Sequence, residues 1–393
     1  MVQGTRELNR SAILTELLRT RPSSRKQLAA STGVSQPTVT RAVDELIADG
    51  LLFEGDEIVV ESRGRRARTI DVVADRALVL GVDLGASNTR VLLADLLATP
   101  ITVSALSTPT ALGPRDLAVW LVQQLRAVAD VRWDRISQVA LGLPGAVSQE
   151  DGSVSNAPNL SQVESPEFLA TLRHELGKPL QIDNDANYAL LGELTFGAAR
   201  ESPNAAILTL GAGLGAGLAV DGRLLRGSRG LVGEFGQLPA GPMGSRLEQL
   251  VTGPGILRRA QDANAHLDDP SALFAADAPP HVRAMRAQFD QALLLVLMAI
   301  VVSCEPNTIV LGGGISKSLI PDLSQYEDSL RMALRYSPRL TGAALGDYSG
   351  ATGAAVASLH AEYSSIGVQR DALAHLPGGT TLNVESLKAA GAV

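Results

Sequence analysis

The stretch LVLGVDLGASN, residues 78–88, decides the fold of most of this chain. Its first residues are apolar up to Asp83, which predicts a buried strand that ends in an acidic side chain. A turn containing Gly85 follows, and residues 90–94 predict the returning strand. Glycines in such a turn let backbone N–H groups approach a phosphate closely, although an ordinary hairpin has the same pattern.

The plan of residues 78–94 is repeated further along the chain. Residues 206–210 (AILTL) predict a strand and precede the glycine-rich run GAGLGAG at 211–217. Residues 308–311 (TIVL) predict another strand, which three glycines follow at 312–314. Two similar strand–turn–strand units predict an α/β body built from two duplicated lobes around a cleft.

The first seventy residues have a different pattern. Apolar residues at helical spacing predict a helix around 13–18, and Ser24 is the expected N-cap of a second helix over 25–31. Gly33 makes a tight turn before a third helix, for which Ser35 is the expected N-cap. Two short strands are then predicted, at 51–53 and 58–60, on either side of a turn at 54–56. This order predicts a winged helix-turn-helix.

The third helix of this N-terminal head is the expected recognition helix, because base-reading side chains lie near the N-terminal end of such helices. The arginine-rich stretch 62–68 is the expected wing or linker, which contacts phosphates or a narrow minor groove. The predicted DNA-binding residues are Ser35, Gln36, Thr38, Thr40, Arg41, Arg63, Arg65 and Arg66. A small helical domain with a basic linker is the alternative interpretation.

Charge is divided unevenly between the head and the body. Residues 1–70 carry a net charge of +2 and the rest of the chain carries −9, which together give the formal net charge of −7. Because phosphate attraction needs local positive charge, a nucleic-acid partner is expected to meet the head. A chance fluctuation in surface charge gives the same small excess.

The remaining composition narrows the class of protein. Cys304 is the only cysteine, which excludes an intrachain disulfide and any multi-cysteine zinc site. Charged residues interrupt the N-terminal apolar residues, so no signal peptide is expected. The apolar run 292–303 is predicted to be a buried core helix and not a membrane span. These features predict a cytoplasmic protein with no membrane partner.

Seven motifs in a fixed order resemble the ROK family (repressors, open reading frames and kinases) of the actin-like ATPase and sugar-kinase superfamily. They are DLGAS at 83–87, GLPG at 142–145, NAPN at 156–159, NDAN at 184–187, GAGLGAG at 211–217, GEFGQ at 233–237 and LGGG at 311–314. The resemblance extends from the head to about Leu359, and the ordered set is far more specific than any single motif.

The resemblance implies a domain organisation as well as an α/β fold. A winged helix-turn-helix is expected over 1–72, followed by a first lobe over 77–185 and a second lobe over 186–340. A helix over 341–362 is expected to return to the first lobe. Residues 363–393 are expected to form a C-terminal tail, to which no function is assigned.

The resemblance also implies a sugar site in the cleft. In kinases of this family, the residue matching Asp185 takes a proton from the sugar hydroxyl that attacks the γ-phosphate, whereas in a sensor the same carboxylate accepts hydrogen bonds from the sugar. From its position alone, at a strand-to-helix turn, Asp185 is expected to cap the helix that follows, and only the resemblance favours the ligand role. The expected sugar-binding residues are Asn159, Asn184, Asp185, Glu234, Gln237 and Glu248, and the expected residues of a weak nucleotide-phosphate site are Asp83, Gly85, Ser87, Gly211, Gly213 and Gly313.

Departures from the family pattern bear on the chemistry. The family often has a histidine at the position of Gln237 and a cysteine-rich loop after it, which together bind zinc. Residues 238–247 contain neither residue type, so no zinc is expected. Ala86 replaces a glycine and Ala212 replaces a threonine of the kinase pattern, which weakens the phosphate turns. ATP and Mg²⁺ are expected only if kinase activity is retained.

The sequence therefore predicts a sugar-responsive transcriptional regulator, more specifically a repressor of carbohydrate metabolism. It is expected to bind operator DNA as a homodimer or homotetramer and a sugar or sugar derivative in its cleft. The main alternative is an ATP-dependent sugar kinase of the ROK family with an accessory head. A regulator that binds a partner protein and no sugar is a third class.

Overall fold

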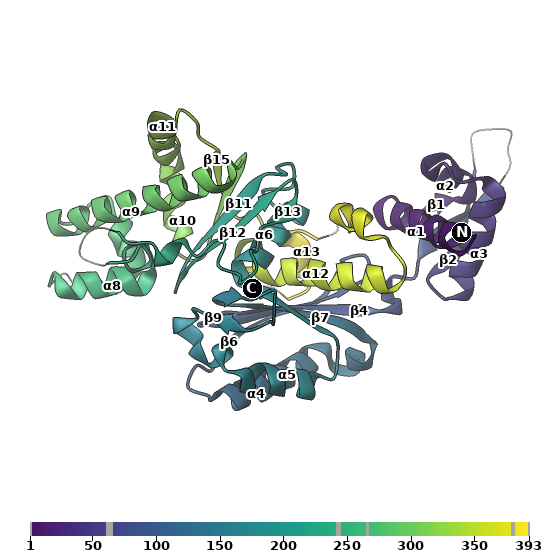
Figure 1. The fold of residues 1–393 in the computed structure, drawn as a ribbon, viewed down its shortest axis with the longest axis horizontal. Helices are drawn as coiled ribbons and strands as arrows, with labels where there is room; N and C mark the ends of the chain where they lie inside the picture. The colour runs from purple at the N-terminus through teal and green to yellow at the C-terminus, as the bar shows by residue number, and fades with distance from the viewer. Residues whose placement is uncertain (1, 60–65, 241–244, 265–266, 379–381, 392–393) are drawn as a thin grey trace.

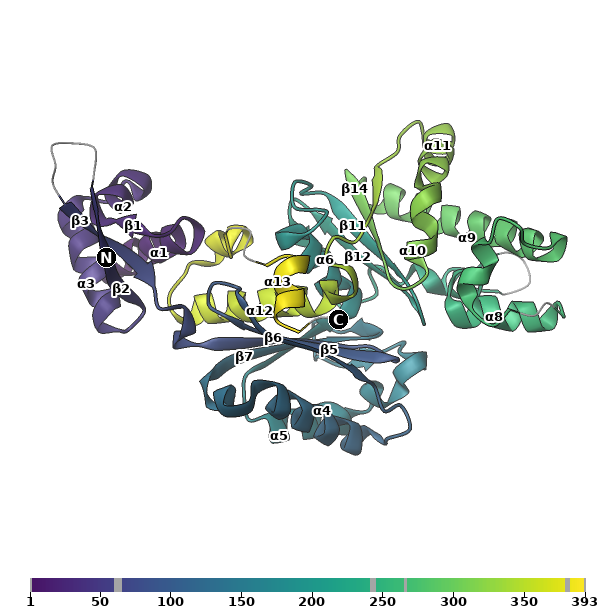
Figure 2. The same ribbon diagram turned by 180° about the vertical axis from the view of Figure 1, so that it is seen from behind.

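The computed structural model describes residues 2–59, 66–240, 245–264, 267–378 and 382–391 (Figure 1). The head lies at one end of the long axis of the molecule, and the two lobes of the body make up the rest (Figures 1 and 2). The expected winged helix-turn-helix on a two-lobed α/β body is confirmed.

Three helices and a three-stranded sheet form the head. Its elements are α1 (Val2–Arg19), β1 (Ser23–Ser24), α2 (Arg25–Thr32), α3 (Gln36–Ala48), β2 (Leu52–Val59) and β3 (Arg66–Val72), and the strand order is β1-β3-β2. Ser24 is the N-cap of α2 in a reciprocal capping box with Gln27, as its position predicts. Gly33 ends α2 in the left-handed conformation, with φ of 71°.

The strand pair predicted for the wing is wrong. Residues 52–53 and 58–59 belong to the single strand β2, whose partner is β3, and residue 60 lies outside the described residues. The pairing shifts its register between Glu54 and Glu57. A Cβ on Gly55 would lie 2.7 Å from the hydroxyl of Thr69, so glycine allows the close approach at this point. The glycine therefore marks a bulge inside a strand rather than a turn between two strands.

The first lobe contains a five-stranded sheet with the order β10-β7-β4-β5-β6. Its strands are β4 (Leu78–Leu84), β5 (Asn88–Asp95), β6 (Pro100–Ser107), β7 (Ile136–Leu143) and β10 (Leu180–Asn184). Helices α4 (Pro114–Ala129) and α5 (Pro166–Leu176) cover one face, and α12 (Ser349–Ser365) covers the other (Figure 1). The short pair β8 (Ala146–Val147) and β9 (Val154–Ser155) follows β7.

The second lobe repeats this plan. Its sheet has the order β13-β12-β11-β14-β15, made of β11 (Ala205–Leu210), β12 (Leu214–Val220), β13 (Arg223–Leu224), β14 (Thr308–Gly312) and β15 (Arg339–Gly342). β11 pairs antiparallel with β12 and parallel with β14, as β4 pairs with β5 and β7. The repeated strand–glycine–strand pattern therefore predicts the duplication correctly. The helices of this lobe are α7 (Glu248–Val251), α8 (Gly253–Asp262), α9 (Pro280–Cys304), α10 (Ser316–Leu319) and α11 (Leu323–Leu334).

Helix α9 is longer than the apolar run predicts. Within the described residues it is the one helix long and apolar enough to cross a membrane by length and composition. One face, including Phe289, Leu293 and Ile300, is buried in the core of the second lobe. Leu295 and Val302 on another face are exposed, at 49% and 74%, so the run is only partly the buried core helix that the sequence predicts.

Two helices cross at the boundary between the lobes. α6 (Asp185–Phe196) contacts β11 and β12 of the second lobe, and it packs along α12. Glycines bring the two backbones together: a Cβ on Gly353 would lie 1.6 Å from the carbonyl oxygen of Tyr188, and one on Gly192 would lie 2.5 Å from that of Ser349. α6 and α12 therefore form a closely packed unit.

The chain after α12 has more structure than the sequence analysis assigned to it. It contains a 3₁₀ turn at Arg370–His375 and the helix α13 (Val384–Ala389). Val368 and Leu376 are buried in a cluster with α1 of the head, and Leu387 is buried near β6. These apolar residues are too widely and irregularly spaced to produce a helical or strand periodicity.

Candidate functional site

A cavity of about 460 Å³ lies between the lobes, where the glycine turns of both sheets and the start of α6 meet. The predicted sugar-binding and phosphate-binding residues come together here. Its lining includes Asn159, Asn184, Asp185, Glu234, Gln237 and Glu248, and also Asp83, Gly85, Ser87, Gly211, Gly213 and Gly313. The motifs that are far apart in the sequence therefore form one site, while the role of each residue toward a ligand stays a prediction.

The sheet of the first lobe positions two of the acidic residues. β4 and β10 both run parallel to β7, so their carboxyl ends lie at the same edge of the sheet. Asp83 lies near the end of β4, and Asp185 follows β10 as the first residue of α6. The first turn of α12 packs against Asp83, since a Cβ on Gly350 would lie 2.6 Å from a carboxylate oxygen of Asp83.

Asn184, the residue before Asp185, is the N-cap of α6. Oδ1 of Asn184 accepts hydrogen bonds from the backbone N–H groups of Ala186 (2.9 Å) and Asn187 (3.2 Å). Nδ2 of Asn184 donates to the carbonyl oxygen of Gly145 at 2.9 Å. Asn184 is therefore engaged mainly in holding the start of α6, and one amide hydrogen is left for a ligand. Asp185 is not the N-cap, although its Oδ1 accepts a hydrogen bond from the N–H of Ala186 at 2.7 Å.

Five carboxylates line the cavity: Asp83, Asp185, Glu234, Glu248 and Asp347. Burial raises the pKa of Asp185 to about 6. Burial, with the nearby charges of Asp185 and Glu248, raises the pKa of Glu234 to about 7. Burial and the charge of Asp185 raise the pKa of Asp83 to about 7. Within the described chain Asp347 pairs with Arg90 and Lys317, whereas none of the other four forms an ion pair, so these four offer hydrogen-bond acceptors to a ligand rich in donors.

Asn159 and Glu248 flank the glycine turn of the second lobe. A Cβ on Gly213 would lie 3.3 Å from Oε1 of Glu248 and 3.4 Å from Nδ2 of Asn159. Asn159 comes from the first lobe, and its Nδ2 donates to the carbonyl oxygen of Ala212 at 3.2 Å. This bond joins the two lobes across the cavity and leaves part of the Asn159 amide available.

The first N–H group of each phosphate turn is already bonded. The N–H of Gly85 donates to the carbonyl oxygen of Asn88, and that of Gly211 donates to the carbonyl oxygen of Gly213, both at 3.0 Å. Ala86 packs against the core of the first lobe. Each turn therefore has one N–H group fewer to offer to a phosphate.

The loop after Gln237 is closed by hydrogen bonds. Oε1 of Gln237 accepts from Nη1 of Arg246 at 2.5 Å, and the backbone N–H of Leu247 donates to the carbonyl oxygen of Leu238 at 3.0 Å. Residues 241–244 lie outside the described residues. Within the described ranges, no group of three or more His, Cys, Asp or Glu side chains is placed to hold a metal ion. The residues present do not fit a zinc ion at this loop.

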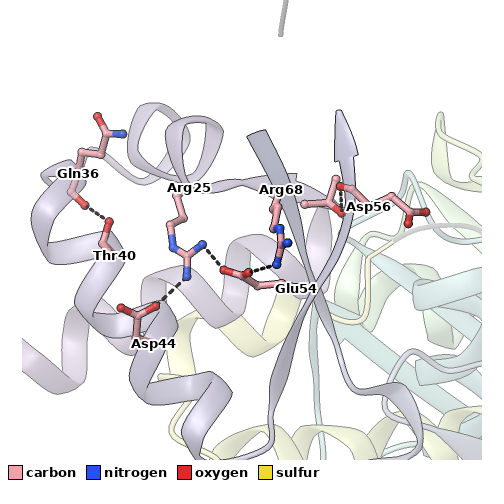
Figure 3. A network of polar contacts seen from close by, with 8 residues as sticks. Arg25, Gln36, Thr40, Asp44, Glu54, Asp56 and Arg68 are labelled. Atoms are coloured by element: carbon pink, nitrogen blue, oxygen red, sulfur yellow. Dashed lines mark hydrogen bonds and ion pairs between the residues drawn. The ribbon is translucent and has the colours of Figure 1, made fainter. Parts of the chain in front are cut away.

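The predicted DNA-reading residues lie at the N-terminal part of α3. Gln36, Thr40 and Arg41 are exposed, and no ion pair of Arg41 with a described residue is found. Ser35 is at the N-cap position, but its hydroxyl bonds that of Thr38 at 2.8 Å and caps no backbone group. The hydroxyl of Thr40 donates to the carbonyl oxygen of Gln36 at 3.0 Å (Figure 3).

Only part of the arginine-rich stretch can be placed. Arg63 and Arg65 lie outside the described residues, and Arg66 begins β3 without a described side chain. Arg68, which the sequence also assigned to the wing, forms an ion pair with Glu54 at 3.1 Å. Arg68 lies in β3, so its predicted place in a flexible loop is wrong, while its contact with DNA stays a prediction.

Glu54 is the centre of a network that the sequence analysis missed (Figure 3). It also pairs with Arg25 at 2.5 Å, and Arg25 pairs with Asp44 of α3 at 2.7 Å. The hydrogen bonds from Arg25 and Arg68 hold the pKa of Glu54 below its usual range. The network ties α2 and α3 to the sheet, so these charges hold the predicted recognition helix in place.

Comparisons with known proteins match both parts of the chain. A model of the ROK family matches residues 79–360, and one of a winged helix-turn-helix DNA-binding domain matches residues 6–52. Similar proteins include the bifunctional enzyme NanE/NanK of Brucella melitensis, 35% identical over 66% of this chain and 49% of that protein. The xylose repressor of Caldicellulosiruptor bescii is 28% identical over 59% of this chain and 58% of that protein. The chain spans about half the length of the curated relatives it matches.

Solved structures agree with this assignment of the fold. A ROK family transcriptional regulator, a homologue of the E. coli MLC protein, matches with a TM-score of 0.72 and 20% identity over 94% of this chain and 99% of that one. The ROK hexokinase of Thermus thermophilus matches with a TM-score of 0.59 and 28% identity over 73% and 99% of the two chains. Because the family match spans well over half of its length, this protein belongs to the ROK family.

Proposed function

We propose that this ROK family member is a sugar-responsive transcriptional regulator, more specifically a repressor. The observation that carries the proposal is the presence, in one chain, of a winged helix-turn-helix with an exposed polar helix end and a cavity between two lobes lined by five carboxylates. Relatives named xylose repressor support the same combination.

The chemistry of the cavity supports a sugar as the ligand. A volume of about 460 Å³ lies within the range of small-molecule sites and suits a monosaccharide. Carboxylates accept hydrogen bonds from hydroxyl groups, and buried carboxylates without such donors are costly. Asp185, Glu234 and Glu248 are the expected hydroxyl acceptors, with the amides of Asn159 and Gln237 as donors. The similar proteins suggest xylose, glucose or an N-acetylhexosamine as candidates.

An ATP-dependent sugar kinase is the second candidate. A specific observation favours it, because the pKa of about 6 suits Asp185 to act as a general base near neutral pH. Phosphoryl transfer also needs positioned donors around the phosphates, however. The bonded N–H groups of Gly85 and Gly211, and the alanines at 86 and 212, argue for slow transfer. We therefore favour binding of the sugar without efficient turnover.

The proposal extends to cofactors, assembly and location. We propose that the protein holds no zinc and no resident nucleotide, because its loop after Gln237 lacks the ligands for zinc and its phosphate turns are weak. Winged-helix repressors bind two half-sites as dimers, so a homodimer or homotetramer is proposed. A DNA-bound regulator of this kind is expected in the cytoplasm.

The proposal is tested with the full chain and a labelled duplex that the protein selects from random DNA. D-xylose, D-glucose, N-acetyl-D-glucosamine and N-acetyl-D-mannosamine are added separately, and DNA affinity is followed by fluorescence anisotropy. We expect one of them to change the affinity by about 5–150-fold, as is typical of coupled sites. A protein that binds no DNA, or whose DNA affinity responds to none of the four sugars, would contradict the proposal.

A further inference from the structure

Glu193 is a buried carboxylate that the proposed sugar site does not use. It lies in α6 and is 0% exposed. Four groups donate hydrogen bonds to it: the hydroxyl of Ser349 (2.7 Å) and the backbone N–H groups of Ala198 (2.7 Å), Ala344 (3.1 Å) and Leu345 (2.9 Å). A buried carboxylate is stable only while its donors stay in place, so Glu193 fixes α6 to the segment around 344–349.

The two elements that Glu193 joins both form the cavity. α6 begins with Asp185, eight residues before Glu193, and the segment that Glu193 holds contributes Gly346, Asp347 and Ser349 to the lining. Ser349 is also the first residue of α12. Glu193 thus lies behind the cavity wall and connects the helix that carries Asp185 with the start of α12.

The far end of α12 reaches the head (Figure 2). The helix has 17 residues, so it is about 25 Å long. Near its end, Leu359 and Tyr363 are buried in the same cluster as Ile13 and Leu17 of α1. The hydroxyl of Tyr363 donates to the carbonyl oxygen of Leu96 at 2.6 Å.

The segment that follows α12 ties it to α1 directly. The backbone N–H of Gln369 donates to the hydroxyl of Ser11 at 2.8 Å, and that of Gly378 donates to the carbonyl oxygen of Leu18 at 3.3 Å. A movement of α12 along its axis would therefore displace α1, against which the recognition helix α3 packs.

We propose that Glu193 is the positioning residue through which a ligand in the cavity changes the DNA affinity of the head. A sugar bound to Asp185 shifts the start of α6, and Glu193 carries that shift to Ser349 and the start of α12. The glycine contacts of Gly192 and Gly353 make the two helices move together, and close-packed interfaces pass on small shifts. The inference rests on the proposed function, because it needs a ligand that affects DNA binding.

The test compares variants of the full chain in the anisotropy assay described above, with calorimetry for the sugar. Glu193→Gln keeps the shape of the side chain but places an NH₂ group against backbone donors. We expect it to bind the sugar and the DNA, and to lower the sugar-induced change in DNA affinity from the parent value to about twofold or less. Because coupling is reciprocal, DNA should also stop changing its affinity for the sugar.

Two serines of α12 give a matched pair of smaller changes. Ser349→Ala removes one donor to Glu193 and should reduce the sugar-induced change. Ser358→Ala removes an equally buried hydroxyl of the same helix, which donates to the carbonyl oxygen of Leu80 at 2.9 Å, and should leave the change as in the parent. This pair decides the matter if Glu193→Gln does not fold.

The outcomes separate this inference from the proposed function. If the parent responds to a sugar and Glu193→Gln responds equally, this inference is overturned and the proposed function stands. Equal losses in Ser349→Ala and Ser358→Ala overturn it as well, because they would reflect a general weakening of α12. A parent that binds none of the sugars overturns the proposed function, and this inference with it.

Discussion

The carboxylates of the head network and most of those in the cavity differ in whether they have a paired cation. In the head, Glu54 is held between Arg25 and Arg68, and Asp44 pairs with Arg25 (Figure 3). In the cavity, four of the five carboxylates have no paired cation among the described residues, and only Asp347 pairs, with Arg90 and Lys317. The paired charges of the head hold its helices against its sheet, whereas the unpaired carboxylates of the cavity are available to a ligand. The same distinction isolates Arg41, which is exposed on α3 outside the ion-pair network.

The largest effect is expected at the unpaired carboxylate of Asp185. Asp185→Asn replaces a charged acceptor of two oxygens with an amide that has one, and hydrogen bonds to charged groups contribute about 1.5–3 kcal/mol. Sugar affinity measured by calorimetry should therefore fall about 10- to 150-fold. DNA affinity without sugar should stay near that of the parent, because the substitution removes hydrogen bonds that form only when the sugar is bound. An unchanged sugar affinity would show that Asp185 does not bind the sugar.

A smaller effect is expected from the unpaired arginine of the head. Arg41→Ala should weaken binding to the selected DNA by about 1–3 kcal/mol if Arg41 contacts a base. The control is Arg68→Ala, which breaks an exposed ion pair worth about 0–1 kcal/mol and should alter DNA binding little. Gel-shift titrations measure both. If Arg68→Ala weakens binding as much as Arg41→Ala, the paired and unpaired arginines do not differ in role.

The arginines of the wing are expected to act through phosphates. Arg65→Ala combined with Arg66→Ala should weaken binding to every sequence and flatten its salt dependence, since fewer counterions are released. Titrations at two salt concentrations, with the selected duplex and a scrambled one, measure this. A loss confined to the selected duplex would show that the two residues read bases instead.

The raised pKa values predict how pH affects the ligand-free protein. Asp185 and Glu234 have pKa values of about 6 and about 7 in the folded state, against ordinary values of 3.8 and 4.5. Folding therefore favours their protonated forms, so their ionisation lowers stability as pH rises from about 4 to about 7, and the penalty is complete above that window. Thermal melts at pH 5 and pH 8 measure this, and Glu234→Gln should reduce the difference. A Glu234→Gln protein with the full pH dependence of the parent would contradict the assignment.

The smallest effect is expected when metal ions are removed from the protein. The loop after Gln237 is closed by its own hydrogen bonds, including the one from Arg246. Washing with a chelator should therefore leave the melting temperature unchanged, and elemental analysis should find no stoichiometric zinc. Zinc at one equivalent would show that residues elsewhere replace the missing cysteines and histidine.

Much of the fold was predictable from the sequence because its signals are local. Glycine turns directly after apolar strands mark both lobes, and they also mark the residues that line the cavity. The helices of the head follow from capping residues such as Ser24 and from Gly33. Motifs that require a particular backbone conformation can therefore be recognised individually in the sequence.

Other features depend on contacts between distant residues and could not be predicted. In the sequence Gly55 has the pattern of a turn residue. In the structure it lies inside a strand, close to the side chain of Thr69. Asn184 and Asp185 are both good helix caps, and only the backbone geometry distinguishes them. Glu193 resembles an exposed helical charge in the sequence, because its donors lie mostly more than 150 residues away.

The most direct test of the account compares sensing and catalysis in one protein sample. Calorimetry and DNA anisotropy are measured with the sugar that binds, and a coupled assay with ATP and Mg²⁺ follows phosphorylation of the same sugar. We predict that the sugar binds and changes the DNA affinity while turnover stays negligible. Turnover of about one per second or more, the range of ordinary kinases, would contradict the sensor and favour the enzyme.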